Sequence, residues 1–175
     1  MSQPHTPKAS IPKLVDAICE VFEKSLPGGE LADRDGVTHC NEAVSYVAKK
    51  LGYSGFDQIR TADPDDAILA NRMFDLMATD PEWLQIDGIV AQSHANTGAL
   101  VVAAWKNPGG VHGHVAVVRP GTLTYSAKWG NQVPQAPRIP KVANVGKAEY
   151  RYIARGANWA FGDEPAYFVL KATLL

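Results

Sequence analysis

The feature that most constrains the fold is a change in the spacing of apolar residues near residue 99. Before this point apolar side chains recur every three or four residues, as on one face of an amphipathic helix. After it they form short β-rich runs, of which ALVVAAW and HVAVV are separated by a turn-forming Asn-Pro-Gly-Gly sequence at 107–110. Helices first and strands second predict an α+β fold with N-terminal helices packed on an antiparallel sheet.

The first half of the chain divides into four predicted helices. They cover residues 11–26, 38–51, 63–77 and 83–98. Pro27-Gly28-Gly29 stops the first helix, whereas Thr38 is expected to cap the start of the second and Gly52 to end it. Later segments, at 122–129, 148–154 and 166–173, predict further strands and loops.

Composition predicts one globular domain over residues 1–175, with a flexible segment at 1–10. The chain is 46% hydrophobic and 20% charged, which suits a domain with a sizeable core. Its formal net charge is −1 and no cluster of Lys or Arg exceeds a pair, so neither nucleic acid nor an anionic membrane is an expected partner.

The N-terminal sequence MSQPHTPKASIPK is polar and interrupted by prolines. It has no apolar segment behind a basic start, and no apolar run in the chain approaches the ~20 residues of a membrane span. The sequence therefore predicts a chain made in the cytoplasm without a signal peptide. Two cysteines are too few for a disulfide framework, so both are interpreted as free thiols.

Cys40 and His114 are the two residues whose side chains and expected positions best suit a catalytic role. A cysteine in the first turn of a helix experiences the positive end of the helix dipole, which favours the reactive thiolate. A histidine at the start of a neighbouring strand can accept the thiol proton and later protonate a leaving amine. Cys19 lies in the apolar stripe of the first helix and fits a core position better.

Zinc binding is the rival use of these residue types. His39, Cys40, His112 and His114 are possible ligands, but the chain has none of the usual zinc-binding spacings. We therefore expect no metal.

Two segments of the sequence resemble the papain-like superfamily, which includes the CHAP and NlpC-type cell-wall amidases and peptidases. They are HCNEAVSYVAKKLG around Cys40 and GHVAVVRPG around His114, and the resemblance covers about Val37 to Gly146. It implies a papain-like fold and cleavage of peptidoglycan amide bonds through a cysteinyl intermediate, without metal or cofactor. Cys40 is then the nucleophile and His114 the base.

The family's third residue orients the histidine and lies on a later strand. We favour Asn144, a polar residue in a short apolar run, ahead of Gln132 and Asn131, with Gln135 also available. No Asp or Glu lies between His114 and Glu149, which departs from the branches that use a carboxylate. The backbone N–H of Cys40 is the expected oxyanion donor, and a side-chain donor from 33–39 stays open.

The expected function is therefore that of a cysteine hydrolase cleaving an amide bond in peptidoglycan. Reaching the periplasm or cell wall would require a non-classical route, such as phage lysis or contact-dependent delivery of a toxin, and a toxin implies a cognate inhibitor protein as partner. One alternative is a papain-like acyltransferase or deamidase acting on a protein or lipid. Another is a non-catalytic binding module that uses Trp129 and the loop 133–140.

Two structural questions stay open at this stage. Trp105, Trp129 and Trp159 fit the lining of a substrate groove and the core equally well. Gly113 fits either a tight hairpin or a close approach by substrate.

Overall fold

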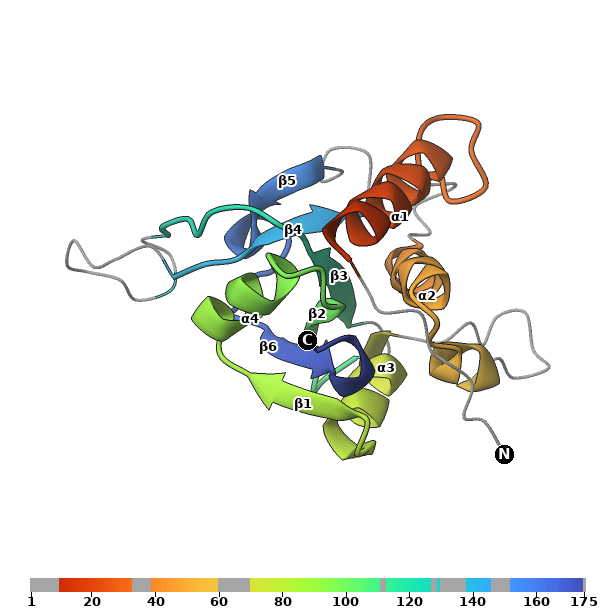
Figure 1. Cartoon of the computed structure of the whole chain (residues 1–175). Helices are drawn as coiled ribbons and strands as arrows, with labels where there is room; N and C mark the ends of the chain where they lie inside the picture. The colour runs from red at the N-terminus through yellow and green to blue at the C-terminus, as the bar shows by residue number, and fades with distance from the viewer. Residues whose placement is uncertain are drawn as a thin grey trace, which may run out of the picture.

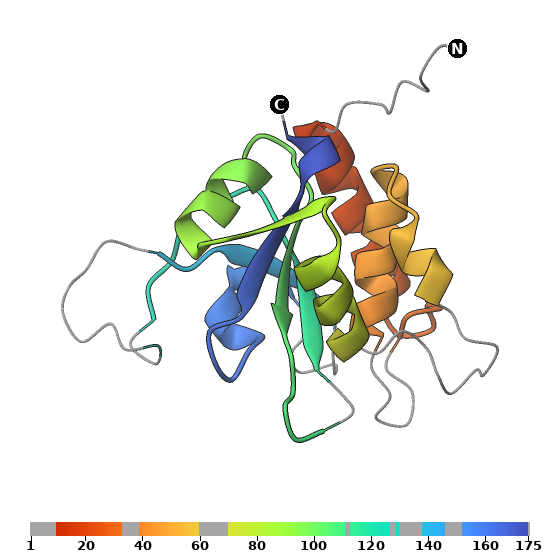
Figure 2. The same cartoon turned by 90° about the horizontal axis from the view of Figure 1, so that it is seen from below.

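A six-stranded antiparallel sheet with helices on both faces forms the part of the chain that the structure describes (Figures 1 and 2). This computed structural model describes residues 10–32, 39–59, 70–110, 113–126, 129, 138–145 and 152–174. The helices are α1 (Ile11–Lys24), α2 (Cys40–Lys50), α3 (Ala70–Thr79) and α4 (Gly88–Ala95), with short 3₁₀ turns η1 (Gly55–Ile59), η5 (Ala157–Trp159) and η6 (Lys171–Thr173). The strands are β1 (Trp83–Ile86), β2 (Val101–Trp105), β3 (His114–Val118), β4 (Lys141–Asn144), β5 (Tyr152–Gly156) and β6 (Ala166–Leu170), in the sheet order β1-β6-β2-β3-β4-β5.

The central strands are apolar throughout because both faces of the sheet are covered. In β2, Val102 and Ala104 belong to the core shared with α1, α2 and α3, whereas Val101 and Ala103 belong to the core beneath α4. Figure 2 shows the sheet standing between these two groups of helices. Alternate residues of a strand point to opposite faces, so a fully buried strand needs apolar residues at every position.

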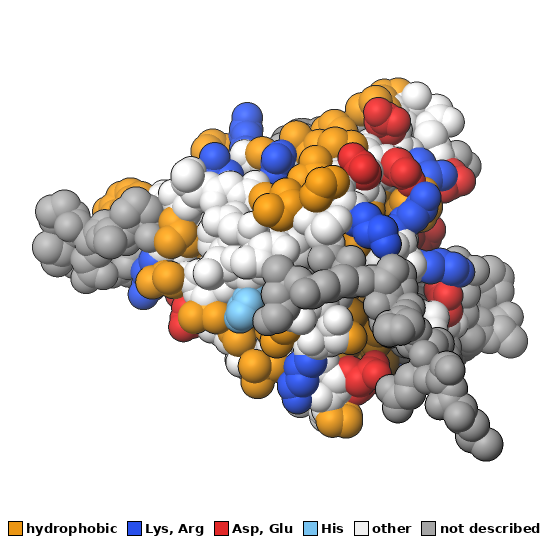
Figure 3. Space-filling view, viewed as in Figure 1, with side chains coloured by type: hydrophobic (Ala, Val, Ile, Leu, Met, Phe, Trp, Pro, Cys, Tyr) orange, Lys and Arg blue, Asp and Glu red, His pale blue; other side chains and the backbone are white. Residues whose placement is uncertain are grey.

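Helices α1 and α2 pack against each other, and the buried residues Leu14, Ile18 and Val21 of α1 belong to its predicted apolar stripe. Ser10 caps α1 by accepting a hydrogen bond from the backbone N–H of Lys13. Outside the core, ion pairs link Lys24 to Glu30 and Lys50 to Glu20. Figure 3 shows acidic and basic side chains interspersed over this end of the molecule, so that the face in view carries no large surface of one charge near these helices.

The α+β class and the packing of helices on an antiparallel sheet are confirmed. The predicted hairpin is also confirmed, because β2 and β3 pair in register from Val101 with Val118 to Trp105 with His114. Gly52 ends α2 as predicted, and its φ of +94° is a conformation that glycine adopts without strain.

The predicted helix 83–98 is wrong in its first part. Trp83–Ile86 forms the edge strand β1, which pairs antiparallel with β6. The helix α4 begins afterwards, where the Asp87 carboxylate accepts hydrogen bonds from the backbone N–H groups of Ile89 and Val90. The sheet therefore has a member that precedes α4 in the chain, and the helices do not all come first.

The N-cap position of α2 is occupied by His39, whose side chain makes no capping hydrogen bond. Thr38, the predicted cap, lies outside the described residues, as do the expected start of the third helix at 63–69 and residues 1–9 of the segment predicted to be flexible. Among the helices that can be described, none combines the length and the apolar character needed to cross a membrane.

Candidate active site

The start of α2 places Cys40 beside the beginning of β3. Cys40 is the first residue of the helix and is only 6% exposed, and α2 packs directly on β3 (Figure 1). The sulfur accepts hydrogen bonds from the backbone N–H groups of Val115 and Asn41. The first N–H groups of a helix have no acceptor within the helix, so they are available to hold a thiolate here.

The first residue of β3, His114, joins Cys40 to Asn144. Its Nε2 lies 2.7 Å from Asn144 Oδ1, and an amide oxygen can only accept, so Nε2 carries a proton. The imidazole also shares a hydrogen bond with the Cys40 side chain. Because Nε2 is engaged with Asn144, Nδ1 is the ring nitrogen left to face the sulfur.

Strand register explains how Asn144 reaches His114. Val117 pairs with Ala143 across β3 and β4, and the next pair in this register is Ala116 with Asn144. Ala116 and His114 lie two residues apart and so share a face of the sheet, which makes Asn144 a diagonal neighbour of His114. An irregularity in the pairing with β5 between Val142 and Asn144 lies next to this position. Asn144 is 1% exposed, so water competes little for its amide.

The pKa of the Cys40 thiol reflects two opposed effects. Burial disfavours the charged thiolate and would raise the pKa. The hydrogen bond and positive charge of His114, together with the backbone donors of Val115 and Asn41, outweigh that effect, so the pKa of Cys40 lies below the ordinary value for a thiol. The site therefore favours the nucleophilic form.

The His114 imidazole shows the complementary behaviour. Burial alone would lower its pKa, but the hydrogen bond and negative charge of Cys40, followed by the hydrogen bond to Asn144, raise the pKa above the ordinary value. Phe161 packs on the ring, with centroids 4.9 Å apart, and limits access of water to it. Together these contacts favour a thiolate–imidazolium pair.

The structure thus brings together Cys40, His114 and Asn144, the three residues favoured from sequence. The alternatives Asn131, Gln132 and Gln135 lie outside the described residues. Cys19 is also a free thiol, partly exposed on α1, and is not among the groups that contact His114 in this arrangement.

One neighbouring interaction was not predicted. His39 directly precedes Cys40, and its Nδ1 lies 2.9 Å from Glu42 Oε1. The sequence signal was present, since His and Glu three residues apart at a helix start can pair. This contact fixes the orientation of the His39 ring at the start of α2.

The structure shows what surrounds Gly113 and the three tryptophans. A Cβ atom at Gly113 would lie 2.4 Å from Asn71 Oδ1 and 2.5 Å from the Trp105 carbonyl oxygen, so the protein's own close packing requires glycine there. Trp105 and Trp129 pack partly against the core beneath α4. Trp159 is 59% exposed, so of these three it is the one that presents its ring to solvent.

No group of three or more His, Cys, Asp or Glu side chains is placed to hold a metal ion within the described part of the chain. His112, one of the four ligands considered from sequence, lies outside that part.

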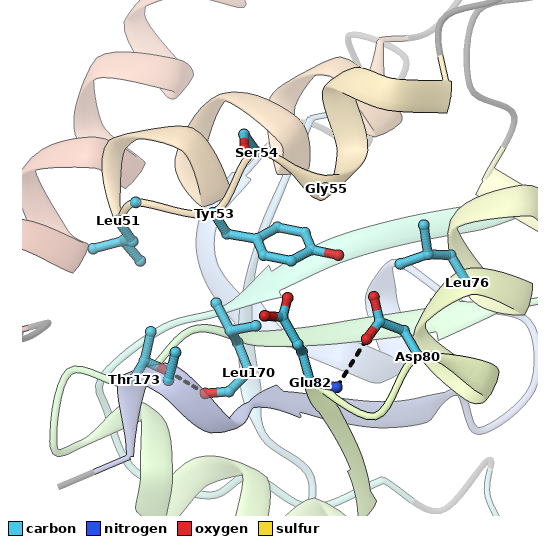
Figure 4. A pocket seen from close by; sticks show the side chains of 11 residues that line it. Leu51, Tyr53, Ser54, Gly55, Leu76, Asp80, Glu82, Leu170 and Thr173 are labelled. Carbon is cyan, nitrogen blue, oxygen red and sulfur yellow. Dashed lines mark hydrogen bonds between the residues drawn. The ribbon is translucent and has the colours of Figure 1, made fainter. Parts of the chain in front are cut away.

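A cavity of about 330 Å³ lies at the opposite end of α2 from Cys40. Its lining includes Tyr53, Asp80, Glu82 and Leu170, and Figure 4 shows the Tyr53 ring extending across it with the two acidic side chains on the facing wall. Since an eleven-residue helix is about 16 Å long, this cavity is separate from the thiol site.

Comparison with models of known protein families finds no match for this chain. A search of curated proteins also finds no significant relative. Membership of the papain-like superfamily therefore stays a prediction carried by the two motifs.

Proposed function

We propose that this protein is a cysteine hydrolase that cleaves an amide bond, with Cys40 as nucleophile, His114 as acid and base, and Asn144 as the residue that orients the imidazole. The observation that carries the proposal is the continuous chain of hydrogen bonds from the Cys40 thiol through His114 to Asn144. The three side chains come from three elements, α2, β3 and β4, so the arrangement exists only when these elements pack together.

The geometry supports acyl transfer in two stages. The Cys40 thiolate adds to the amide carbonyl carbon, and the His114 imidazolium gives its proton to the departing amine, leaving a thioester on the sulfur. Water then attacks the thioester, with His114 accepting its proton, and releases a carboxylic acid and the thiol. Asn144 keeps the Nε2 proton in place, so Nδ1 remains the atom that exchanges protons.

Stabilisation of the intermediate is the second requirement. The Cys40 backbone N–H, at the start of α2, is the proposed donor to the developing oxyanion. The positive end of the helix dipole favours negative charge at the same place.

Peptidoglycan is the proposed substrate, as the resemblance of the segments around Cys40 and His114 to cell-wall amidases implies. Stem peptides and cross-bridges offer the amide bonds that this chemistry requires. If the protein acts as a delivered toxin, a cognate inhibitor protein is the proposed partner.

The decisive experiment is digestion of purified peptidoglycan sacculi by the wild type and by Cys40→Ala, with fragments identified by mass spectrometry. We expect fragments from the wild type and none above background from Cys40→Ala, because no other group replaces the thiolate. Cys19→Ala is the matched control and should digest like the wild type.

Absence of fragments with every protein, over several wall chemotypes, would reject peptidoglycan as substrate. Turnover of a protein or lipid substrate that depends on Cys40 would then indicate an acyltransferase or deamidase. Equal alkylation of Cys40 and Cys19 by iodoacetamide, mapped by mass spectrometry, would count against the catalytic site itself.

A further inference from the structure

We propose that Asn71 is a positioning residue, which holds the β2–β3 connection against α3 and thereby sets the place of His114 between Cys40 and Asn144. The inference concerns the site of the proposed function and rests on its thiol–imidazole pair, although not on the identity of the substrate. Asn71 is the second residue of α3 and lies far from His114 in the sequence.

The Asn71 amide binds the backbone of this connection at two residues. Its Oδ1 accepts from the backbone N–H of Asn107 at 2.9 Å. Its Nδ2 donates to the carbonyl oxygens of Asn107 at 3.3 Å and of Gly110 at 3.0 Å. A carboxamide carries its donor and its acceptor on two neighbouring atoms, so it can satisfy both backbone groups of one residue.

The same amide lies against the residue that immediately precedes His114. A Cβ atom at Gly113 would approach Asn71 Oδ1 to 2.4 Å, closer than real Cβ atoms come to other atoms. Asn71 therefore contacts the connection near its start, at its turn and at its end. Gly113 is the matching half of this arrangement, because any larger residue would push the backbone away from Asn71.

The helix that carries Asn71 is itself well anchored. Met73 and Met77 of α3 are buried in the core shared with α2 and β3. One turn after Asn71, Asp75 pairs with Lys106 at the start of the same connection. That ion pair is exposed and contributes little, so the amide contacts provide most of the attachment.

Placement matters because the His114 ring must meet two partners at once. Its Nε2 reaches Asn144 at 2.7 Å while the ring also hydrogen-bonds the Cys40 side chain. A displacement of about 1 Å in such a group can cost on the order of 100-fold in rate. Removing the Asn71 amide frees the backbone that leads into β3, and the ring then spends less time in contact with the thiol.

The test measures iodoacetamide alkylation of Cys40 against pH in a Cys19→Ala background, with and without Asn71→Ala. Loss of the ordered imidazole should move the apparent pKa for alkylation towards that of an ordinary thiol. A rise of about one unit corresponds to a roughly tenfold slower reaction at about pH 6, where the thiolate is limiting. On a substrate that the wild type cleaves, kcat should fall while KM changes little.

Asp75→Ala is the matched control on the same helix, since it removes the other tie to the connection but leaves the amide. It should keep the wild-type alkylation profile. If Asn71→Ala does not fold, Asn71→Asp decides the matter, because it is nearly isosteric but replaces the donor with a second acceptor and should shift the profile in the same direction.

An unchanged alkylation profile in a folded Asn71→Ala or Asn71→Asp protein would overturn the proposal. Alkylation of Cys40 requires no substrate, so this result is independent of whether sacculi are digested. A wild type that leaves sacculi uncut, combined with an alkylation profile that shifts on loss of the amide, would reject the wall substrate and support the positioning role.

Discussion

The two ends of α2 show different kinds of polar site. At its start, Cys40 is buried and hydrogen-bonded to His114, which is in turn held by Asn144. At its end, the cavity of about 330 Å³ is lined in part by Asp80 and Glu82, which are not linked to any thiol or imidazole in the described residues. The end proposed to carry the chemistry is therefore the one whose polar groups are connected to one another.

The difference follows from what each environment does to a charge. The helix start supplies backbone donors and a favourable dipole to the thiolate, and His114 supplies the opposite charge. At the other end, the acidic side chains raise the pKa of Tyr53 after burial has already done so, which keeps the phenol neutral. Of these two arrangements, only the first favours the charged form of its group, the Cys40 thiolate.

The two ends of α2 should differ most in how much activity is lost when a side chain is changed, and the largest loss is expected on removing the proposed base, His114. His114→Ala should reduce kcat by about 10²–10⁴-fold, the usual contribution of general acid–base catalysis. The matched change at the far cavity, Glu82→Gln, should leave activity unchanged. Steady-state digestion of a Cys40-dependent substrate measures both, and comparable losses in the two variants would remove the distinction between the ends.

Asn144→Ala should produce an intermediate effect. Losing a charge-assisted hydrogen bond of about 1.5–3 kcal/mol corresponds to roughly 10- to 150-fold in rate. The bond to Asn144 raises the pKa of His114, so its loss lowers that pKa. Because the imidazolium disappears as pH rises through its pKa, the alkaline limb of the rate profile should move to lower pH.

Asn144→Asp sharpens this prediction. A carboxylate keeps the acceptor and adds a negative charge, which should move the alkaline limb to higher pH. A pH–rate profile that is the same for Ala, Asp and Asn at this position would contradict the orienting role of Asn144.

The smallest effect on activity is expected from Tyr53→Phe. The hydroxyl of Tyr53, a residue that is 7% exposed, accepts a hydrogen bond from Trp83 Nε1 at 3.0 Å. Removing it leaves a buried donor without that acceptor, so the free energy of unfolding should fall by about 1–3 kcal/mol. Urea denaturation measures this loss, and Cys40 alkylation should be unchanged. Altered alkylation would mean that the two ends of α2 are coupled.

Local sequence patterns predicted the elements that carry the site. Helical spacing and polar neighbours placed Cys40 at the start of α2, and the break after Gly113 placed His114 at the start of β3. Strand Trp83–Ile86 was missed because a short edge strand followed at once by a helix resembles a continuous apolar segment. The cap at Asp87 was the available signal.

Residues whose role depends on distant partners were not predictable in the same way. Asn71 acts on a connection that lies well beyond it in the chain, and Phe161 reaches the His114 ring from the segment after η5. Neither has a local pattern that distinguishes it from any other helix amide or core aromatic residue.

The sequence by itself determined the α+β class, the hairpin and the candidate identities of the nucleophile and base, because these follow from residue spacing and side-chain chemistry within short segments. Only the tertiary structure decided that the three side chains meet. Asn144 faces His114 because β4 pairs with β3 in one register, and a slip of one residue would turn its side chain to the opposite face. Pairing between distant strands is set by how the whole sheet buries its two apolar faces, which no single segment specifies.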